Sequence, residues 1–180
     1  MAYEQKQGEQ KVKGKFFLKK MTAEGAFSGY ASVYDQVDQH KDKVQRGAFR
    51  KSLGKMKEAC TFPKMLWQHD PAFPIGKWEC VEEQEKGLYV EGRLFLELPK
   101  AREAYVLLKE KVVEGLSIGY ETVKASRCAA YRLLEEVRLF EISLVTFPAN
   151  TAARVLGVKK EGQELLEKIE GLQRILRGEA

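Results

Sequence analysis

The sequence predicts a mostly β fold with flanking helices, arranged as a closed or nearly closed antiparallel barrel that helices surround. Three observations lead to this prediction. Six or more segments have the alternation or the β-branched and aromatic composition of strands, whereas few have helical periodicity. Strands and helices do not alternate regularly, which argues against a parallel sheet of βαβ units. With 180 residues, the chain suffices for one domain with a real hydrophobic core.

We divide the chain into three parts. Residues 1–13 are polar and rich in lysine and glutamine, so we expect a flexible tail there. Residues 14–158 hold the predicted barrel. The last part, residues 159–180, carries apolar side chains at steps of four and three, at Leu165, Ile169, Leu172 and Leu176. This spacing predicts an amphipathic helix, which could form a dimer seam; its few heptads favour packing on its own barrel instead.

The first half of the barrel domain consists mainly of predicted strands. They cover residues 16–18, 26–34, 64–69, 77–81 and 87–96. A polar run over 35–43 suits a loop and contains His40, and a short helix-like stretch follows from Gly47 to about Glu58. His69 stands where its strand gives way to a turn, because Asp70-Pro71 restricts the backbone that follows.

The second half begins with a helix and returns to strands. Pro99 can start this helix, and apolar residues at helical spacing continue it to about Val113. Strands are predicted over 117–124 and over about 131–146. Asn150 can cap a short helical turn that reaches Arg154.

One serine lies between two glycines, in the stretch GLSIGY from Gly115 to Tyr120. The letters satisfy the G-x-S-x-G nucleophile elbow of α/β-hydrolases, but that motif needs a strand before the serine, a helix after it and a histidine later in the chain. Here the helix comes first and both histidines precede the serine. A nucleophilic Ser117 would therefore belong to another architecture. Its flanking glycines would let a substrate backbone approach; alternatively, they let a helix pack tightly against the strand.

His69 is the candidate general base. A serine hydroxyl becomes a good nucleophile only when a base takes its proton, and imidazole titrates near neutral pH. The other histidine, His40, lies in the polar loop, so we expect any serine mechanism to use His69. The alternative is a structural histidine, hydrogen-bonded at a strand end, for example to Asp70.

Glu141 is the candidate acid that would orient the imidazole and stabilise its cation. Both faces of its predicted strand are rich in apolar residues, which predicts at least partial burial of the carboxylate. A buried carboxylate is costly unless it is paired, so a structural ion pair with Arg138 or Arg93 is the alternative. Asp70 and Glu121 compete with Glu141 for the orienting role.

Composition narrows the classes of function. No apolar run is long enough to span a bilayer and the start lacks a signal-peptide core, so we expect a cytoplasmic protein with no membrane partner. The cysteines at 60, 80 and 128 are widely spaced, which indicates reduced thiols rather than a zinc site or disulfides, and we expect no metal or cofactor. The net charge of +5 comes largely from lysines near the start. No series of arginine or aromatic residues accompanies these lysines, so they indicate a solvated edge or tail rather than a specific nucleic-acid surface.

Several motifs follow one another along the chain: GAF at 47–49, LWQHD at 66–70, PIG at 74–76, GLSIGY at 115–120, EISLVT at 141–146 and PAN at 148–150. In this order they resemble the prohead maturation serine proteases of tailed bacteriophages, over roughly residues 16–155. The resemblance implies that His69 and Ser117 are the base and the nucleophile. Glu141 falls where we place the third member of the triad.

The family is similar to the herpesvirus assembly proteases, which have a barrel surrounded by helices and the triad order His, Ser, His. Here Glu141 would take the last position, since the chain has no third histidine. The resemblance implies a serine endopeptidase that cleaves scaffold protein, or the scaffold-like region of the major capsid protein, inside the assembling procapsid in the host cytoplasm. It also implies self-cleavage and a dimer. The alternatives are a non-catalytic capsid assembly or scaffolding protein that keeps the barrel, and a nucleic-acid-binding barrel.

Overall fold

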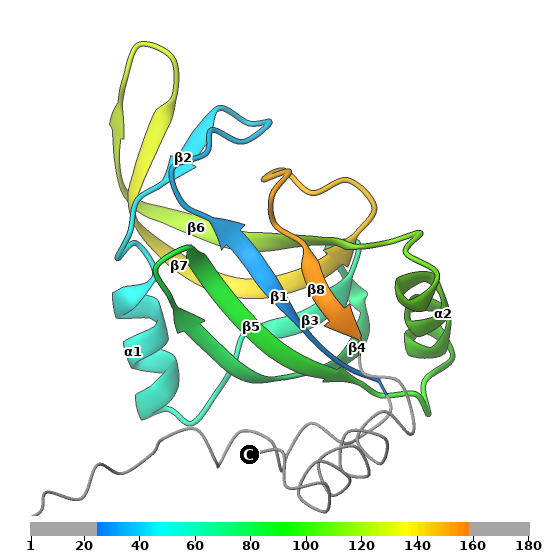
Figure 1. The fold of residues 1–180 in the computed structure, drawn as a ribbon. Helices are drawn as coiled ribbons and strands as arrows, with labels where there is room; N and C mark the ends of the chain where they lie inside the picture. Colours follow the sequence, from blue (N-terminus) through cyan, green and yellow to red (C-terminus); the bar gives the residue numbers. More distant parts are fainter. Residues whose placement is uncertain (1–24, 159–180) are drawn as a thin grey trace, which may run out of the picture.

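The computed structural model describes residues 25–158, which form one curled sheet with two helices packed against it (Figure 1). The predicted tail, the strand predicted over 16–18 and the C-terminal helix predicted over 159–180 lie outside the described residues. The elements of the described part are β1 (Ala26–Val33), β2 (Asp42–Val44), α1 (Arg50–Glu58), β3 (Lys64–Trp67), β4 (Asp70–Glu83), β5 (Gly87–Leu94), α2 (Pro99–Lys109), β6 (Gly115–Arg127), β7 (Arg132–Val145) and β8 (Val155–Val158).

The sheet has the strand order β2-β7-β3-β4-β5-β1-β8, and β6 pairs with β7 as well. Most neighbours are antiparallel, as predicted from the sequence. The exceptions are β2 and β3, which pair in parallel with successive stretches of β7. β7 thus pairs with segments both near and far in sequence. β6 precedes it directly, whereas each residue of β3 pairs with a β7 residue 77 positions later, as in Lys64 with Glu141.

The sheet curls strongly but stays an open half-barrel, so the closed barrel predicted from the sequence is not confirmed. Its two ends approach at an isolated bridge between Gly115 and Arg154. A backbone hydrogen bond of 3.0 Å from Leu116 N to Ala153 O supports this bridge. β6 and β7 then continue together as a hairpin that projects beyond the sheet (Figure 1). In the described residues no continuous strand ladder joins the two ends.

Apolar side chains from most strands and both helices form one core, because alternation turns every second strand residue to the same side. Phe27 and Trp78 meet edge to face in it, with ring centroids 5.5 Å apart. Gly92 provides the space for Trp78, since a Cβ there would lie 2.7 Å from its ring. Each large apolar side chain buried in this way stabilises the fold by about 1.5–3 kcal/mol.

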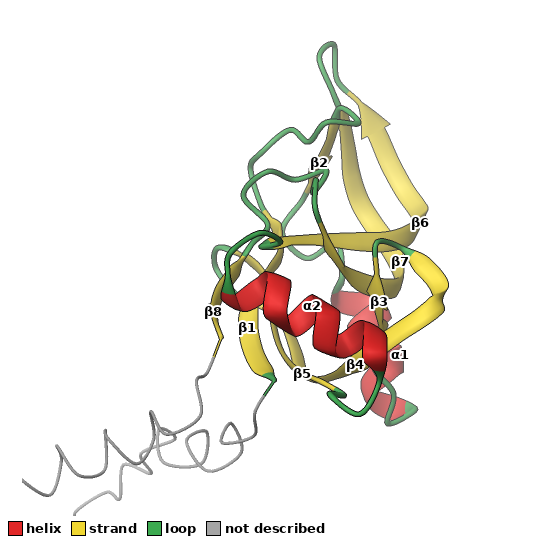
Figure 2. Ribbon diagram, turned by 90° about the vertical axis from the view of Figure 1, so that its right-hand side faces the viewer, coloured by secondary structure: helices red, strands yellow, loops and turns green. Residues whose placement is uncertain are grey.

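The two helices lie on opposite sides of the sheet in Figure 1, and Figure 2 shows α2 running across it. α2 starts at Pro99 as predicted but ends at Lys109, before the predicted end near Val113. Between Asn150 and Arg154 the chain makes a turn rather than the predicted helical turn. Strand β8, which follows, was not predicted, because its four residues carry little pattern of their own.

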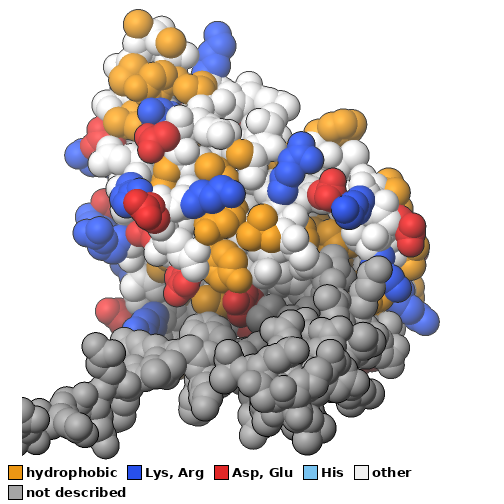
Figure 3. Space-filling view, viewed as in Figure 1, with side chains coloured by type: hydrophobic (Ala, Val, Ile, Leu, Met, Phe, Trp, Pro, Cys, Tyr) orange, Lys and Arg blue, Asp and Glu red, His pale blue; other side chains and the backbone are white. Residues whose placement is uncertain are grey.

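The surface agrees with a chain of mixed charge. Figure 3 shows basic, acidic and apolar side chains interspersed over one face, without a large patch of a single sign. Within residues 25–158 neither helix is long and apolar enough to cross a membrane. Cys60, Cys80 and Cys128 are free thiols.

Candidate active site

Three strands bring the three sequence-predicted site residues to one region. Ser117 lies near the start of β6, Glu141 lies on β7, and His69 follows the end of β3. β7 runs between the other two strands: its Ser143 pairs with Ser117 on one side and with Leu66 on the other. Since paired residues point to the same face of a sheet, β7 presents Glu141 and Ser143 between the serine and the histidine.

His69 and Glu141 are in direct contact. Their Nδ1 and Oε1 atoms are 2.6 Å apart, although the residues are 72 positions apart in sequence. The carboxylate side chain is 13% exposed and the imidazole 43% exposed, so the acid is inside and the ring reaches the surface. With Glu141 ionised, Nδ1 carries the proton and donates a hydrogen bond to Oε1, which leaves the lone pair on Nε2 free to accept a second proton.

The contact raises the pKa of His69 above its ordinary value of 6.5. The hydrogen bond to Glu141 is the largest cause, partial burial of the ring acts in the opposite direction, and the negative charge of the carboxylate adds to the rise. A carboxylate that stabilises the imidazolium in this way makes His69 a stronger base than a solvated histidine.

Ser143 links the carboxylate to the backbone of His69. Its fully buried Oγ donates a hydrogen bond of 2.5 Å to Glu141 Oε2 and accepts one of 3.2 Å from His69 N. Both carboxylate oxygens are therefore engaged, one by the imidazole and the other by the hydroxyl. Sequence alternation placed Ser143 on the same strand face as Glu141, but that pattern did not show which partner its hydroxyl would take.

His69 lies in a turn of unfavourable backbone geometry. Trp67 and Asp70 are paired, so Gln68 and His69 form a two-residue hairpin loop, one step before the turn predicted at Asp70-Pro71. Both loop residues have positive φ, 54° for Gln68 and 61° for His69. This conformation suits Asn-Gly or Asp-Gly, and it costs other residues about 1–2 kcal/mol each. Strain of this kind at a candidate base is typical of functional sites.

The end of β7 holds this turn in place. Gln68 N donates a bond of 2.9 Å to Leu144 O. The side-chain amide of Gln68 donates to Thr146 Oγ1 at 2.8 Å and accepts from Thr146 N at 3.3 Å. Together with the bonds from Ser143 and Glu141, these contacts fix a loop that would otherwise relax.

Ser117 is 7% exposed and lines a cavity of about 100 Å³ together with His69. Ser32 also lines this cavity, and its buried Oγ has no hydrogen-bond partner in the described part of the chain. Ala149 and Asn150 line it from the loop after β7, and His40 lines it from the polar loop. The sequence pattern drew attention to neither Ser32 nor His40 as neighbours of Ser117, because both come from segments far away in the chain.

The glycines around Ser117 make room for this chain's own groups. A Cβ at Gly119 would overlap Glu141 Oε1 and lie 2.8 Å from Glu141 Cδ and Cγ. A Cβ at Gly115 would lie 2.6 Å from Val145 O and 2.8 Å from Pro148 Cδ. The alternative was that these glycines let a helix pack against the strand. The atoms nearest to them instead belong to Glu141, Val145 and Pro148. Gly119 leaves the space that the carboxylate occupies.

The competing acids have other partners. Asp70 Oδ1 accepts a hydrogen bond from the backbone of Ala72. Glu121 forms an ion pair with Arg138, which was one of the alternative partners considered for Glu141. The other one, Arg93, lies 4.0 Å from Glu79. Among the candidate acids, Glu141 is the one in contact with His69.

A second polar cluster borders the cavity. Asp42 on β2 is buried, and Arg132 binds both its oxygens through Nε at 2.7 Å and Nη2 at 2.6 Å. Tyr120 donates a further hydrogen bond of 2.9 Å to Oδ2. The bonds from Arg132 are the main reason that the pKa of Asp42 lies below its ordinary value. The cluster ties β2 to β6 and β7 beside Ser117.

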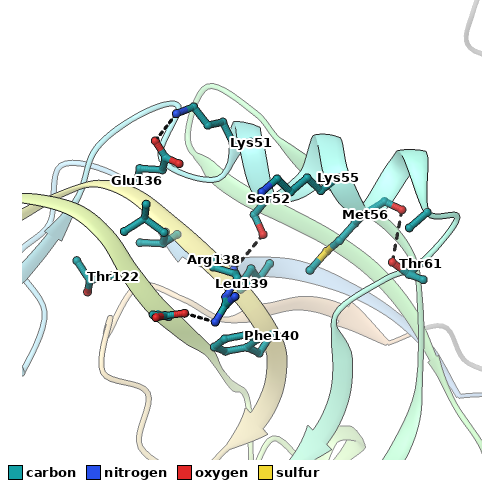
Figure 4. A pocket seen from close by; sticks show the side chains of 14 residues that line it. Lys51, Ser52, Lys55, Met56, Thr61, Thr122, Glu136, Arg138, Leu139 and Phe140 are labelled. Atoms are coloured by element: carbon teal, nitrogen blue, oxygen red, sulfur yellow. Dashed lines mark hydrogen bonds and ion pairs between the residues drawn. The ribbon is translucent and has the colours of Figure 1, made fainter.

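A larger hollow of about 700 Å³ lies between α1 and the β6–β7 hairpin (Figure 4). Lys51 forms an ion pair of 2.6 Å with Glu136 in it, and Ser52 Oγ accepts a hydrogen bond of 3.0 Å from Leu139 N. Several polar side chains of this hollow are thus engaged with other groups of the chain. None of Ser117, His69 and Glu141 lines this hollow, so size alone does not locate the candidate site.

Two phage proteins are similar to this chain in sequence. The prohead protease of Enterobacteria phage HK97 is 34% identical over 157 residues, which cover 82% of this chain and 66% of that protein. A capsid polyprotein of Pseudomonas phage PAJU2 is 33% identical over 107 residues, 55% of this chain but only 16% of that protein. This chain therefore spans slightly less than two thirds of the first relative and a small part of the second.

Among solved structures, the capsid assembly protease of bacteriophage T4 aligns with a TM-score of 0.52 at 10% identity, over 67% of this chain and 82% of that one. At this identity the likeness concerns the fold alone. The family model of the caudovirus prohead serine proteases matches residues 15–168 of the sequence, which include all the described strands and helices. The chain belongs to the caudovirus prohead serine protease family.

Proposed function

We propose that the chain is a serine endopeptidase in which Ser117 is the nucleophile, His69 the general base and Glu141 the group that orients the base. One observation carries this proposal: Nδ1 of His69 is held 2.6 Å from a mostly buried carboxylate, while its ring lines the same cavity as Ser117. Membership of the prohead protease family supports the same reading.

The proposed reaction is an acyl transfer in two stages. His69 Nε2 takes the proton of Ser117 Oγ as the oxygen attacks the carbonyl carbon of the scissile peptide bond. The new imidazolium gives this proton to the leaving amine as the C–N bond breaks. Water then attacks the acyl-enzyme with His69 again as base, and the acid product and free Ser117 result. Glu141 stabilises the imidazolium in both stages because its carboxylate accepts the hydrogen bond from Nδ1–H.

The negative oxygen of the tetrahedral intermediate needs hydrogen-bond donors. Backbone N–H groups are suited to this, since they can be aimed without burying a charge. The loop at residues 147–151 is our candidate, because its Ala149 and Asn150 line the cavity that contains Ser117. The unpartnered hydroxyl of Ser32 in this cavity is a further group that a bound peptide could engage.

We infer that the substrate is scaffold protein or the scaffold-like region of a major capsid protein, and that the chain also cleaves itself. The similarity to a prohead protease and to part of a capsid polyprotein supports this substrate class. The proposed place of action is the assembling procapsid in the host cytoplasm, where the chain would act as a dimer.

Intact mass spectrometry tests the proposed nucleophile. Wild type and Ser117→Ala are incubated at neutral to mildly alkaline pH, with and without a serine-reactive phosphonate probe. We expect the probe to add covalently to the wild type at Ser117, and any fragments from self-cleavage to be absent from Ser117→Ala. Ser28→Ala, on β1 and outside the cavity, is the matched control and should behave as wild type. Fragments that persist in Ser117→Ala, or a wild type that the probe leaves unmodified, would contradict the proposal.

A further inference from the structure

We propose that Ser143 is a positioning residue of this site, whose hydroxyl locks the strained turn that carries His69 to the carboxylate that orients it. This inference rests on the proposed function of Ser117, His69 and Glu141. It adds a fourth residue, which is fully buried and acts through its two neighbours rather than on the substrate.

The first step concerns what holds His69. Gln68 and His69 both have positive φ, so their turn needs contacts that compensate an unfavourable backbone. The bonds from Leu144 and Thr146 hold Gln68 only. The backbone N–H of His69 donates to Ser143 Oγ at 3.2 Å, which ties the base itself to β7.

The second step concerns what holds Glu141. A glutamate side chain has three rotatable bonds, and the bond of 2.6 Å to His69 leaves one oxygen to be placed. Ser143 Oγ donates to that oxygen, Oε2, at 2.5 Å. A hydroxyl has one proton to donate and lone pairs to accept with, so one side chain can serve both neighbours at once.

The third step is the sequence spacing that makes this possible. Glu141 and Ser143 are two residues apart on one strand, and they therefore point to the same face. Leu66 pairs with Ser143, and the parallel β3 ends at the next residue, Trp67, so that the turn that follows brings His69 over this face. Without the hydroxyl, the carboxylate would lose one of its two anchors and the His69 N–H its side-chain acceptor.

The experiment follows the titration of His69 by NMR in the full-length chain. The chain has two histidines, so the signals of His69 are identified by their absence from His69→Gln. We expect Ser143→Ala to lower the pKa of His69 toward 6.5, because the freed carboxylate swings away from Nδ1. The rate of phosphonate labelling at Ser117 should fall by about 10²-fold, the effect of a misplacement of about 1 Å.

Two further variants and one control separate positioning from simple loss of stability. Ser143→Thr keeps the hydroxyl and should restore both the pKa and the labelling rate. Ser143→Cys keeps the side-chain size but bonds weakly, so it should resemble Ser143→Ala with the packing preserved. The matched control is Ser52→Ala: this serine is also buried and also accepts a backbone N–H of β7, but in the larger hollow. Ser52→Ala should lower the melting temperature, but it should leave the pKa of His69 and the labelling rate at Ser117 as in the wild type.

The outcomes are distinguishable. An unchanged or raised pKa of His69 in Ser143→Ala, with wild-type labelling at Ser117, would overturn the positioning role alone. If Ser52→Ala lowers the pKa of His69 and the labelling rate as much as Ser143→Ala does, the positioning role is also overturned, since the effect would then be one of general stability. A wild type that is not labelled at Ser117 would overturn the proposed function, and the inference with it.

Discussion

Replacing Gly119 by alanine is the most direct way to test whether the carboxylate of Glu141 must stay where it is. The added methyl group would overlap Glu141 Oε1 and lie 2.8 Å from Cδ and Cγ, whereas ordinary contacts begin at 3.4 Å. Oε1 cannot retreat toward His69, because the two groups are already 2.6 Å apart. The carboxylate must therefore shift sideways, and its bond to the imidazole is lost or badly lengthened.

The expected size of the effect follows from this displacement. A shift of roughly 1 Å in a group that positions a catalytic residue costs about 10²-fold in rate, which corresponds to about 2.7 kcal/mol of transition-state stabilisation. The assay is the rate of phosphonate labelling at Ser117 by intact mass, with the melting temperature measured on the same samples. Gly119→Ala should label about 10²-fold more slowly and still unfold cooperatively.

Gly157→Ala is the matched control for this variant. Gly157 also lies in a strand, but a Cβ there would have no atom within 4 Å. It should label at the wild-type rate. If Gly119→Ala also labels at the wild-type rate while it remains folded, the contact between Glu141 and His69 does not support catalysis and our reasoning is refuted.

Three other predictions concern pH and stability. Labelling at Ser117 should rise with pH through a midpoint above 6.5, because His69 must be neutral to accept the proton and its pKa is raised by Glu141; a midpoint at or below 6.5 would refute this. Arg132→Ala should cost about 3 kcal/mol in urea unfolding, since it leaves the buried charge of Asp42 without its ion partner. The pKa of Asp42 is lowered in the folded state, so the stability from this pair should be present above about pH 4 and disappear as pH falls through the folded-state pKa. Arg132→Ala should not show this loss of stability at low pH. Ser32→Ala should raise the melting temperature by about 2–4 °C, because it removes a buried hydroxyl that has no partner; a lower melting temperature would show that the hydroxyl is satisfied in the folded protein.

Much of the local structure could be predicted from the sequence because it depends on local periodicity. Alternating apolar residues indicated β5 and β7, and Pro99 marked the start of α2. The same alternation placed Glu141 on a partly buried strand face, where it lies with 13% of its side chain exposed. The ordered motifs also indicated the protein family, which the family comparison confirms.

Other features of the site depended on contacts between distant segments. The sequence alone left Asp70, Glu121 and Glu141 as candidates for the orienting acid. The choice among them depends on the parallel pairing of β3 with β7, which brings His69 within 2.6 Å of Glu141 across 72 positions. Strand alternation describes the faces of one strand and contains no information about which strand lies beside it.

Local patterns in the sequence therefore indicated most of the strands, the start of α2, the protein family and three residues to consider for the site. The folded chain was needed to see that the sheet stays open, that Gly119 makes room for Glu141, and that Ser143 joins this carboxylate to the turn of His69. The physical reason is that periodicity is a property of neighbouring residues. Register, hydrogen-bond partners and the space beside a glycine are set by strands that meet only when the chain has folded.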